Sequence, residues 1–195
     1  MAVLDVLFFY DIFTYYSPVS AGNINNSSIA RSATAWKEAP VDIKQRIGEP
    51  MRLKIPSIAV DAEVERVALA SDGSMEAPAQ PLDTAWYSLG PRPGEIGSAT
   101  IAGHVDWKYG ATAVFANLRK LKPGDTITVQ DDKGTNISFV VRFSRNYDAA
   151  ADATEVFFSD DGKAHLNLST CSGAWNKKTK QYDHRLVVFA DREME

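Results

Sequence analysis

The amino-acid sequence predicts a mostly β protein that folds as a closed, mostly antiparallel eight-stranded barrel with one or two short helices. Short runs of apolar and β-rich residues recur through residues 50–195, and several of them alternate apolar with polar positions. Turn residues separate the runs, as at Asp72-Gly73 and Pro123-Gly124. Many short strands with few helical insertions are typical of a barrel.

The expected elements follow from these patterns. Helical spacing in residues 113–121 predicts a short helix, and an acidic loop over residues 147–162 contains a helical turn at 153–158. Residues 78–97 hold four prolines and are interpreted as an irregular loop. The eight expected strands span residues 51–55, 59–67, 74–77, 98–103, 126–130, 136–143, 165–170 and 186–190.

Residues 1–49 are interpreted as a partial N-terminal anchor followed by a linker, and residues 50–195 as the folded domain. Residues 2–16 are strongly apolar and aromatic, but Asp5 and Asp11 interrupt a run already shorter than the roughly 20 residues of a membrane span. A segment that packs on the domain is the alternative. Residues 17–32 are rich in Ser, Asn and Gly, as in solvated linkers, and a short helix is expected at 36–47. Membrane association through this N-terminal region is a further expectation.

Composition limits the functional classes. The formal net charge of -4 argues against a nucleic-acid partner, which usually meets a basic surface. The sequence contains one cysteine, Cys171, so an intramolecular disulfide framework and a cysteine-rich zinc site are both excluded. A lone thiol is a liability in an oxidising compartment, and its presence calls for a reason.

Three chemically versatile residues stand at the ends of expected strands. Cys171 follows the strand at 165–170, and Arg185 precedes the strand at 186–190, so adjacent strands would bring the thiol and the guanidinium together. His104 closes the apolar strand at 98–103 and can supply the missing base. Taken singly, such a cysteine is more often a small buried hydrophobe, and such a histidine or arginine is usually structural. His165 and His184 keep these structural interpretations.

Three separated motifs resemble those of the sortases, cysteine transpeptidases of the Gram-positive cell envelope. The motifs are AGHVDW with His104, NLSTC with Cys171 and HRLVVFA with Arg185. The family typically carries TLxTC, a Gly-His pair after a strand and an arginine opening the last strand. Leu168, Thr170 and Cys171 match TLxTC, while Asn167 departs from its first threonine. The resemblance covers about residues 51–192, and GHVDW looks most like the actinobacterial class lettered F.

The resemblance implies a reaction in two steps. The enzyme would cleave an LPxTG-like sorting signal after its threonine through a thioacyl-enzyme, and would transfer the acyl group to an amine such as a cell-wall precursor peptide. This reaction attaches surface proteins to the cell wall, at the extracellular face of the membrane. Residues 17–49 lack the Asp-Pro-aromatic lid motif of many pilus-building members, which favours an anchoring role.

The resemblance also implies residue roles. Cys171 would be the nucleophile, its thiolate favoured by protonated His104 and by Arg185. His104 would be the general acid and base, and Arg185 would bind a developing oxyanion. Thr170 is expected to touch substrate, with packing as the alternative, and Asp106 is a candidate for orienting His104. No cofactor is expected. Some sortases bind calcium, but an acidic loop such as 152–161 is more commonly a solvated wall.

Two further classes stay open from the sequence. An L,D-transpeptidase also uses cysteine, histidine and arginine on a β-rich domain, but its Ser-x-Gly before the cysteine does not fit Leu168-Ser169-Thr170-Cys171. A non-catalytic β-rich surface module would keep the thiol in its core. A thiol reagent separates the classes, because a core thiol stays inert in the folded protein.

Overall fold

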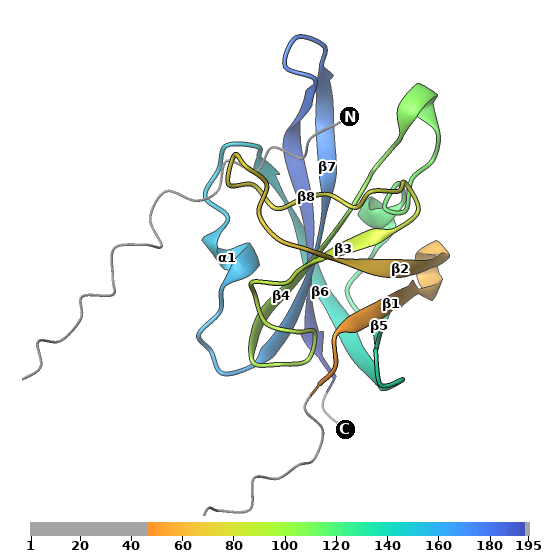
Figure 1. The fold of residues 1–195 in the computed structure, drawn as a ribbon, viewed down its shortest axis with the longest axis vertical. Helices are drawn as coiled ribbons and strands as arrows, with labels where there is room; N and C mark the ends of the chain where they lie inside the picture. The colour runs from red at the N-terminus through yellow and green to blue at the C-terminus, as the bar shows by residue number, and fades with distance from the viewer. Residues whose placement is uncertain (1–46, 194–195) are drawn as a thin grey trace, which may run out of the picture. The chain divides into compact units, whose positions relative to one another are not determined.

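The computed structural model of the protein describes residues 47–193, and eight strands in this part of the chain close into one barrel (Figure 1). Neighbouring strands follow one another around the barrel in the order β1-β2-β3-β4-β7-β8-β6-β5. The predicted fold class is therefore confirmed. The anchor, the linker and nearly all of the helix expected before residue 47 lie outside the described residues. The strands are β1 (Pro50–Ile55), β2 (Val60–Val67), β3 (Thr84–Tyr87), β4 (Gly97–Gly103), β5 (Thr126–Asp131), β6 (Asn136–Asp148), β7 (Ala164–Asn176) and β8 (Gln181–Arg192).

The helices of the described region are all short. The expected helical turn is confirmed by α1 (Thr154–Phe157), in the connection between β6 and β7. The helix expected at 113–121 is wrong, because this segment makes successive i→i+3 turns that end in one 3₁₀ helix. No helix within residues 47–193 is long and apolar enough to cross a membrane. The 3₁₀ helices are η1 (Pro56–Ile58), η2 (Lys108–Gly110) and η3 (Leu118–Lys120).

One expected strand is misplaced. Residues 74–77 form no strand and contribute only an isolated bridge between Met75 and Leu69. The missing strand is β3, which lies inside the proline-rich stretch expected to be irregular. All four of its residues are buried, so it shows no alternation of apolar and polar positions. Its Trp86 packs into the main core and donates a hydrogen bond from Nε1 to the Pro91 carbonyl at 3.1 Å.

Two of the strand pairings are parallel, β2 with β3 and β4 with β7, while the others are antiparallel. Parallel neighbours run in the same direction, so β4 and β7 finish at the same end of the barrel. The chain between them forms β5, β6 and α1. This topology brings together two strand ends that are far apart in sequence.

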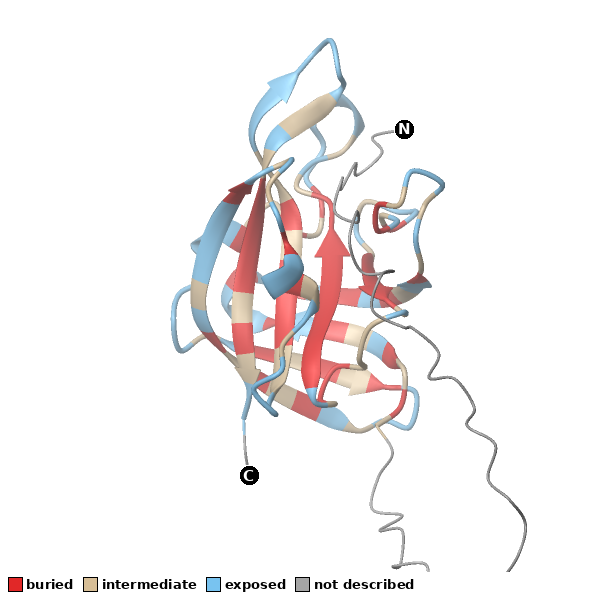
Figure 2. Cartoon of the chain, turned by 90° about the vertical axis from the view of Figure 1, so that its left-hand side faces the viewer, coloured by how far each residue is buried: buried red, intermediate tan, exposed pale blue. Residues whose placement is uncertain are grey.

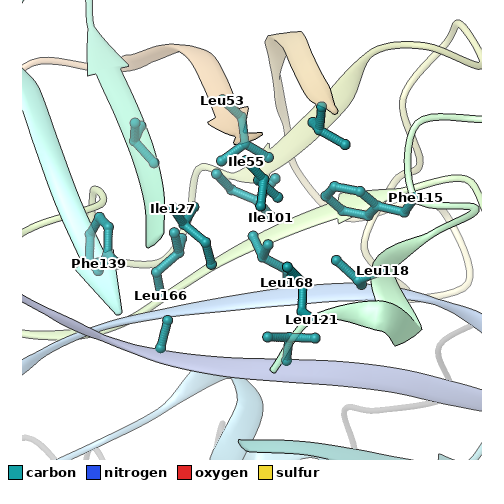
Figure 3. Packing of buried hydrophobic residues seen from close by; sticks show 14 of the residues in the cluster. Leu53, Ile55, Ile101, Phe115, Leu118, Leu121, Ile127, Phe139, Leu166 and Leu168 are labelled. Carbon is teal, nitrogen blue, oxygen red and sulfur yellow. The ribbon is translucent and has the colours of Figure 1, made fainter. Parts of the chain in front are cut away.

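A single apolar core fills the barrel (Figure 3). Strand β4 is buried along its whole length, and in Figure 2 buried positions alternate with others along several further strands. Burying one large aliphatic side chain stabilises a fold by about 1.5–3 kcal/mol, so this core holds the strands rigidly. Fully buried members of the core include Leu53, Ile55, Ile101, Phe115, Leu118, Ile127, Phe139, Leu166 and Leu168.

Strands β7 and β8 run further than the sequence predicts and form a hairpin that projects beyond the barrel (Figure 1). Both continue through the region expected to be a loop, and the turn occupies only residues 177–180. Trp175 lies opposite Tyr182 across the hairpin, with ring centroids 5.2 Å apart. Cross-strand aromatic pairs stabilise hairpins, which explains the extension. The tip is exposed (Figure 2).

Candidate active site

Cys171 on β7 lies directly opposite Arg185 on β8. Side chains alternate between the two faces of a strand, and directly opposed residues share a face. Leu168 and Val188, which are also opposed, point into the core. The odd-numbered Cys171 and Arg185 therefore both face outward, at the end of the barrel from which the hairpin projects.

The Arg185 side chain is fixed on this outer face. The residue is only 3% exposed, and Tyr147 on β6 lies opposite it on the side away from Cys171. Its Nη1 donates hydrogen bonds to the backbone carbonyls of Tyr182 at 3.0 Å and His184 at 2.9 Å. A planar guanidinium bonded in this way has a defined orientation beside the thiol.

His104 reaches the same end of the barrel through the parallel pairing of β4 with β7. Ala102 pairs with Ser169, so His104 and Cys171 each stand two residues further along their strands. The Thr170 hydroxyl donates to the Gly103 carbonyl at 2.7 Å and ties together the residues immediately before them. The three residues identified by sequence are thus brought to one place.

Close packing and one hydrogen bond fix the His104 ring. Gly103 must lack a side chain here, because a Cβ atom would meet the Phe115 ring at 2.6 Å. The His104 carbonyl accepts a hydrogen bond from the Phe115 amide at 2.9 Å, which pins the backbone. His104 is 6% exposed, and its ring packs edge-on against the Trp107 ring, with the ring centroids 4.8 Å apart.

The Pro78 carbonyl determines which ring nitrogen of His104 can take up a proton. Nε2 lies 2.9 Å from this oxygen, and a carbonyl only accepts hydrogen bonds, so Nε2 carries the hydrogen. In the neutral ring the lone pair is then on Nδ1. If His104 acts as a base, Nδ1 is the nitrogen that can accept a proton.

Burial raises the pKa of the Cys171 thiol above its ordinary value. The positive charge of Arg185 lowers this pKa, and the negative charge of Asp106 raises it. Arg185 favours the thiolate as expected, but desolvation has the larger effect, so the pKa of Cys171 still lies above its ordinary value. The Cys171 thiol therefore gives up its proton less readily than a free cysteine.

Comparison with known proteins identifies the family. The family model for the sortase domain matches residues 53–193. The chain belongs to the sortase family. A search of curated proteins gives no match.

Solved sortases share the fold at low sequence identity. Sortase C-1 from Actinomyces oris is 20% identical, with a TM-score of 0.59 over 75% of this chain and 76% of that one. A lid mutant of sortase A from Corynebacterium diphtheriae is 20% identical, with a TM-score of 0.59 over 78% and 75%. Sortase C2 of Group B Streptococcus Pilus Island 1 is 22% identical, with a TM-score of 0.58 over 76% of each chain. At these identities the likeness concerns the fold alone.

The other two histidines lie elsewhere in this sortase. His165 stands six positions before Cys171, about 20 Å along β7, and hydrogen-bonds Asp191 at 2.7 Å and Asp161 at 3.0 Å. His184 adjoins Arg185, so its side chain points to the opposite face of β8. It lies between Asp183 at 2.7 Å and Asp148 at 3.0 Å. Both have the structural contacts expected of them.

Asn167, the departure from the sortase TLxTC motif, anchors the connection that covers the outer face. Its Nδ2 donates to the Val156 carbonyl at 2.7 Å, and Thr100 on β4 donates to the same oxygen at 2.9 Å. Val156 belongs to α1, so β4 and β7 hold this helix jointly. The substitution therefore has a structural role on the face that Cys171 shares.

Thr170 and Asp106 have other partners than a substrate or His104. The Thr170 hydroxyl is buried and bonded to Gly103, and a role in substrate binding stays a prediction. The Asp106 carboxylate accepts a hydrogen bond from the Tyr182 hydroxyl at 2.5 Å, while the His104 ring is bonded to Pro78.

Sequence reasoning missed both Tyr182 and the Pro78 carbonyl. A backbone oxygen leaves no signature in a sequence. Tyr182 offered one signal, its position three residues before Arg185 at the edge of a motif.

Within residues 47–193, no group of three or more His, Cys, Asp or Glu side chains is arranged to hold a metal ion. The acidic stretch over 152–161 is instead engaged in local bonds. Asp152 accepts from Thr154, and Asp161 accepts from the Lys163 amide and from His165. No cofactor is predicted, and calcium binding at this stretch is not tested by the structure.

The electrostatic balance at Cys171 is tested by neutralising one carboxylate. Because Asp106 disfavours the thiolate, Asp106→Asn should move the midpoint of thiol reactivity to lower pH. The rate of Cys171 alkylation by iodoacetamide, measured across pH, gives this midpoint. Asp160→Asn, at an exposed carboxylate of the β6–β7 connection, is the matched control and should match the native curve. An upward or absent shift in Asp106→Asn would contradict the assignment.

Proposed function

We propose that the protein cleaves an LPxTG-like sorting signal after its threonine and transfers the acyl group to an amine. The observation that carries the proposal is the register that opposes Cys171 to Arg185, with His104 at the adjacent strand end, in a chain of the sortase family. A thiol, a base and a fixed cation are the groups that acyl transfer through a thioester requires.

In the first step the Cys171 sulfur attacks the threonine carbonyl of the signal. The thiol must lose its proton to attack, and His104 Nδ1 is the acceptor that the Pro78 contact leaves basic. The amide bond to the following glycine then breaks, and His104 returns the proton to the departing amine. The product is a thioester on Cys171 and a free amino terminus on the released fragment.

In the second step an amine attacks the thioester. His104 Nδ1 removes a proton from the nucleophile, a new amide bond forms, and the Cys171 thiol is regenerated with that proton. Water in place of the amine would give hydrolysis, so transfer depends on the amine arriving first.

Arg185 stabilises the negative charge that develops on the carbonyl oxygen in both steps. Its burial supports this role, because charge interactions strengthen where water is excluded. The two backbone carbonyls that hold Nη1 fix the guanidinium before substrate arrives, so little reorganisation accompanies the reaction.

The proposed biological role is attachment of surface proteins to the cell wall. The substrates are then LPxTG-type surface proteins, and the acceptor is an amine such as a cell-wall precursor peptide. The reaction takes place at the extracellular face of the cell membrane. Membrane association through the N-terminal region belongs to this proposal.

A trapped thioester tests the nucleophile. Native protein incubated with an LPxTG peptide should gain the mass of the acyl fragment on Cys171, because the thioester is an obligatory intermediate. Cys171→Ala should fold normally, gain no mass and cleave no peptide. Intact-protein mass spectrometry and a quenched fluorescent peptide give the two readouts. Peptide cleavage by the alanine variant would remove the basis of the proposal.

The choice of histidine is tested by three matched variants. His104→Ala should lower the rate about 10²- to 10⁴-fold, the usual range for a general acid–base group. His165→Ala and His184→Ala should stay within a few-fold of native, because their contacts are structural. Turnover numbers from the peptide assay decide the comparison. If either control lost as much activity as His104→Ala, the assignment of the base would be wrong.

Arg185→Lys separates charge from geometry. Lysine keeps the positive charge but lacks the planar fork, so the rate should fall at least about tenfold, and Arg185→Ala should fall further. The defect should appear in kcat more than in KM, because the contact strengthens in the transition state. Steady-state kinetics measure both constants. Native kinetics in Arg185→Lys would show that charge alone suffices.

A further inference from the structure

The hairpin that carries Cys171 and Arg185 loses strand support just beyond the thiol. On one side, β4 ends at Gly103, and its pairing with β7 finishes at Ala102 opposite Ser169. On the other side, the pairing of β6 with β8 finishes at Asp148 opposite His184. Ser172 and Asp183 still hydrogen-bond Asn146 and the Ala149 amide, and beyond them the hairpin over residues 172–183 continues past both neighbouring strands.

The internal pairing of this hairpin is also irregular close to the thiol. The register between β7 and β8 shifts between Ser172 and Trp175. Gly173 there has a φ of 81°, which favours glycine, and its position leaves no space for a side chain beside Asp183. A bulge bends the strand that contains it, so the ladder alone does not fix the direction of the hairpin.

The segment that follows His104 forms a loop closed on itself. Asp106 and Thr112 make an isolated bridge, and the Trp107 amide donates to the Ala111 carbonyl at 2.9 Å. This loop, residues 104–112, lies beyond the end of β4, just as residues 172–183 lie beyond the pairings with β4 and β6. Catalysis as proposed above requires the two segments to keep a fixed separation.

One side-chain hydrogen bond joins them. The Tyr182 hydroxyl donates to Asp106 Oδ2 at 2.5 Å, between residues 76 positions apart in the sequence. Tyr182 is itself held firmly, because Arg185 Nη1 binds its carbonyl and the Trp175 ring packs against its ring. A short bond to a carboxylate is of the stronger, charge-assisted kind.

The Tyr182 phenol, which donates this bond, stays protonated near neutral pH. Partial burial, together with the hydrogen bond to Asp106, raises the pKa of Tyr182 to about 12. The phenol therefore keeps its proton at every pH at which the protein is expected to act, and the bond persists over that range.

We propose that Asp106 and Tyr182 are positioning residues whose hydrogen bond holds the loop after His104 against the hairpin extension over residues 172–183, next to Cys171 and Arg185. The bond joins the two segments at a point where the β4–β7 pairing has already ended. Without it, the loop and the outer part of the hairpin lose this direct tie, and the distance between His104 and the thiol is held less tightly, by the Thr170–Gly103 bond and the strand pairings alone. This inference rests on the proposed function for its kinetic consequence, and its structural consequence can be measured without substrate.

The kinetic test removes the bond from each side. Tyr182→Phe deletes one oxygen and keeps the ring, and Asp106→Ala deletes the acceptor. Each should lower kcat for peptide cleavage by about tenfold, with a smaller change in KM, because misplacement by about 1 Å can cost up to about 10²-fold. Asp106→Asn keeps an oxygen that accepts from Tyr182, and should retain activity that Asp106→Ala loses. The double variant of Tyr182→Phe with Asp106→Ala should be no slower than the slower single variant.

Tyr109→Phe is the matched control, because it makes the same change at a fully exposed tyrosine of the same loop. It should leave kinetics at native values. The proposal is overturned if Tyr182→Phe also keeps native kcat, if Asp106→Asn is as slow as Asp106→Ala, or if the two single losses multiply in the double variant. Loss in Asp106→Asn would mean that the charge matters rather than the bond.

Amide hydrogen exchange, followed by mass spectrometry, tests the bond independently of any peptide. Exchange in residues 104–112 and 172–183 should be at least about threefold faster in Tyr182→Phe, and unchanged in Tyr109→Phe. Unchanged exchange in Tyr182→Phe would overturn the proposal even if the peptide is a good substrate. If native protein cleaves no LPxTG peptide but exchange responds as expected, the proposed function fails while the positioning contact stands.

Discussion

The parallel pairing of β4 with β7 is the constraint on which the rest of the site depends. Parallel neighbours end at the same side of a sheet, so the pairing carries His104 to the thiol although the whole of β5, β6 and α1 intervenes in sequence. A slip of one residue in β7 would turn Cys171 inward, because side chains alternate with a period of two. The Thr170 bond to Gly103 and the buried leucines of β7 oppose such a slip.

Burial has two opposite effects on the chemistry of this end of the barrel. It weakens the thiol as an acid, because a thiolate loses solvation there. It also strengthens the field of Arg185, which shares the low-dielectric surroundings. The first effect makes a base necessary, and the second favours the charged states that form after the proton has moved. For the reaction proposed above, this arrangement lowers the reactivity of the resting thiol and favours the charged states that follow proton removal.

Local patterns in the sequence predict much of this architecture, and contacts between distant residues account for what they miss. Most strands alternate visibly, and Cys171, His104 and Arg185 fall in or beside recognisable strands, so the barrel and the trio follow from the sequence and its motifs, although β7 and β8 continue past Cys171 and Arg185. Strand β3 does not, because full burial removes its alternation and prolines flank it. The Asp106–Tyr182 bond joins two common residue types far apart in the chain. The upward pKa shift of Cys171 depends on how deeply the folded chain buries the sulfur, which no local pattern reveals.

The burial of Cys171 also affects how readily its thiol is oxidised. Peroxides attack a thiolate far faster than a thiol, so a protonated sulfur forms sulfenic acid slowly. The sequence offers no second cysteine with which a sulfenic acid could form a protective disulfide. Oxidation beyond that stage is irreversible for most proteins. The burial that raises the pKa of the Cys171 thiol therefore also slows its oxidation.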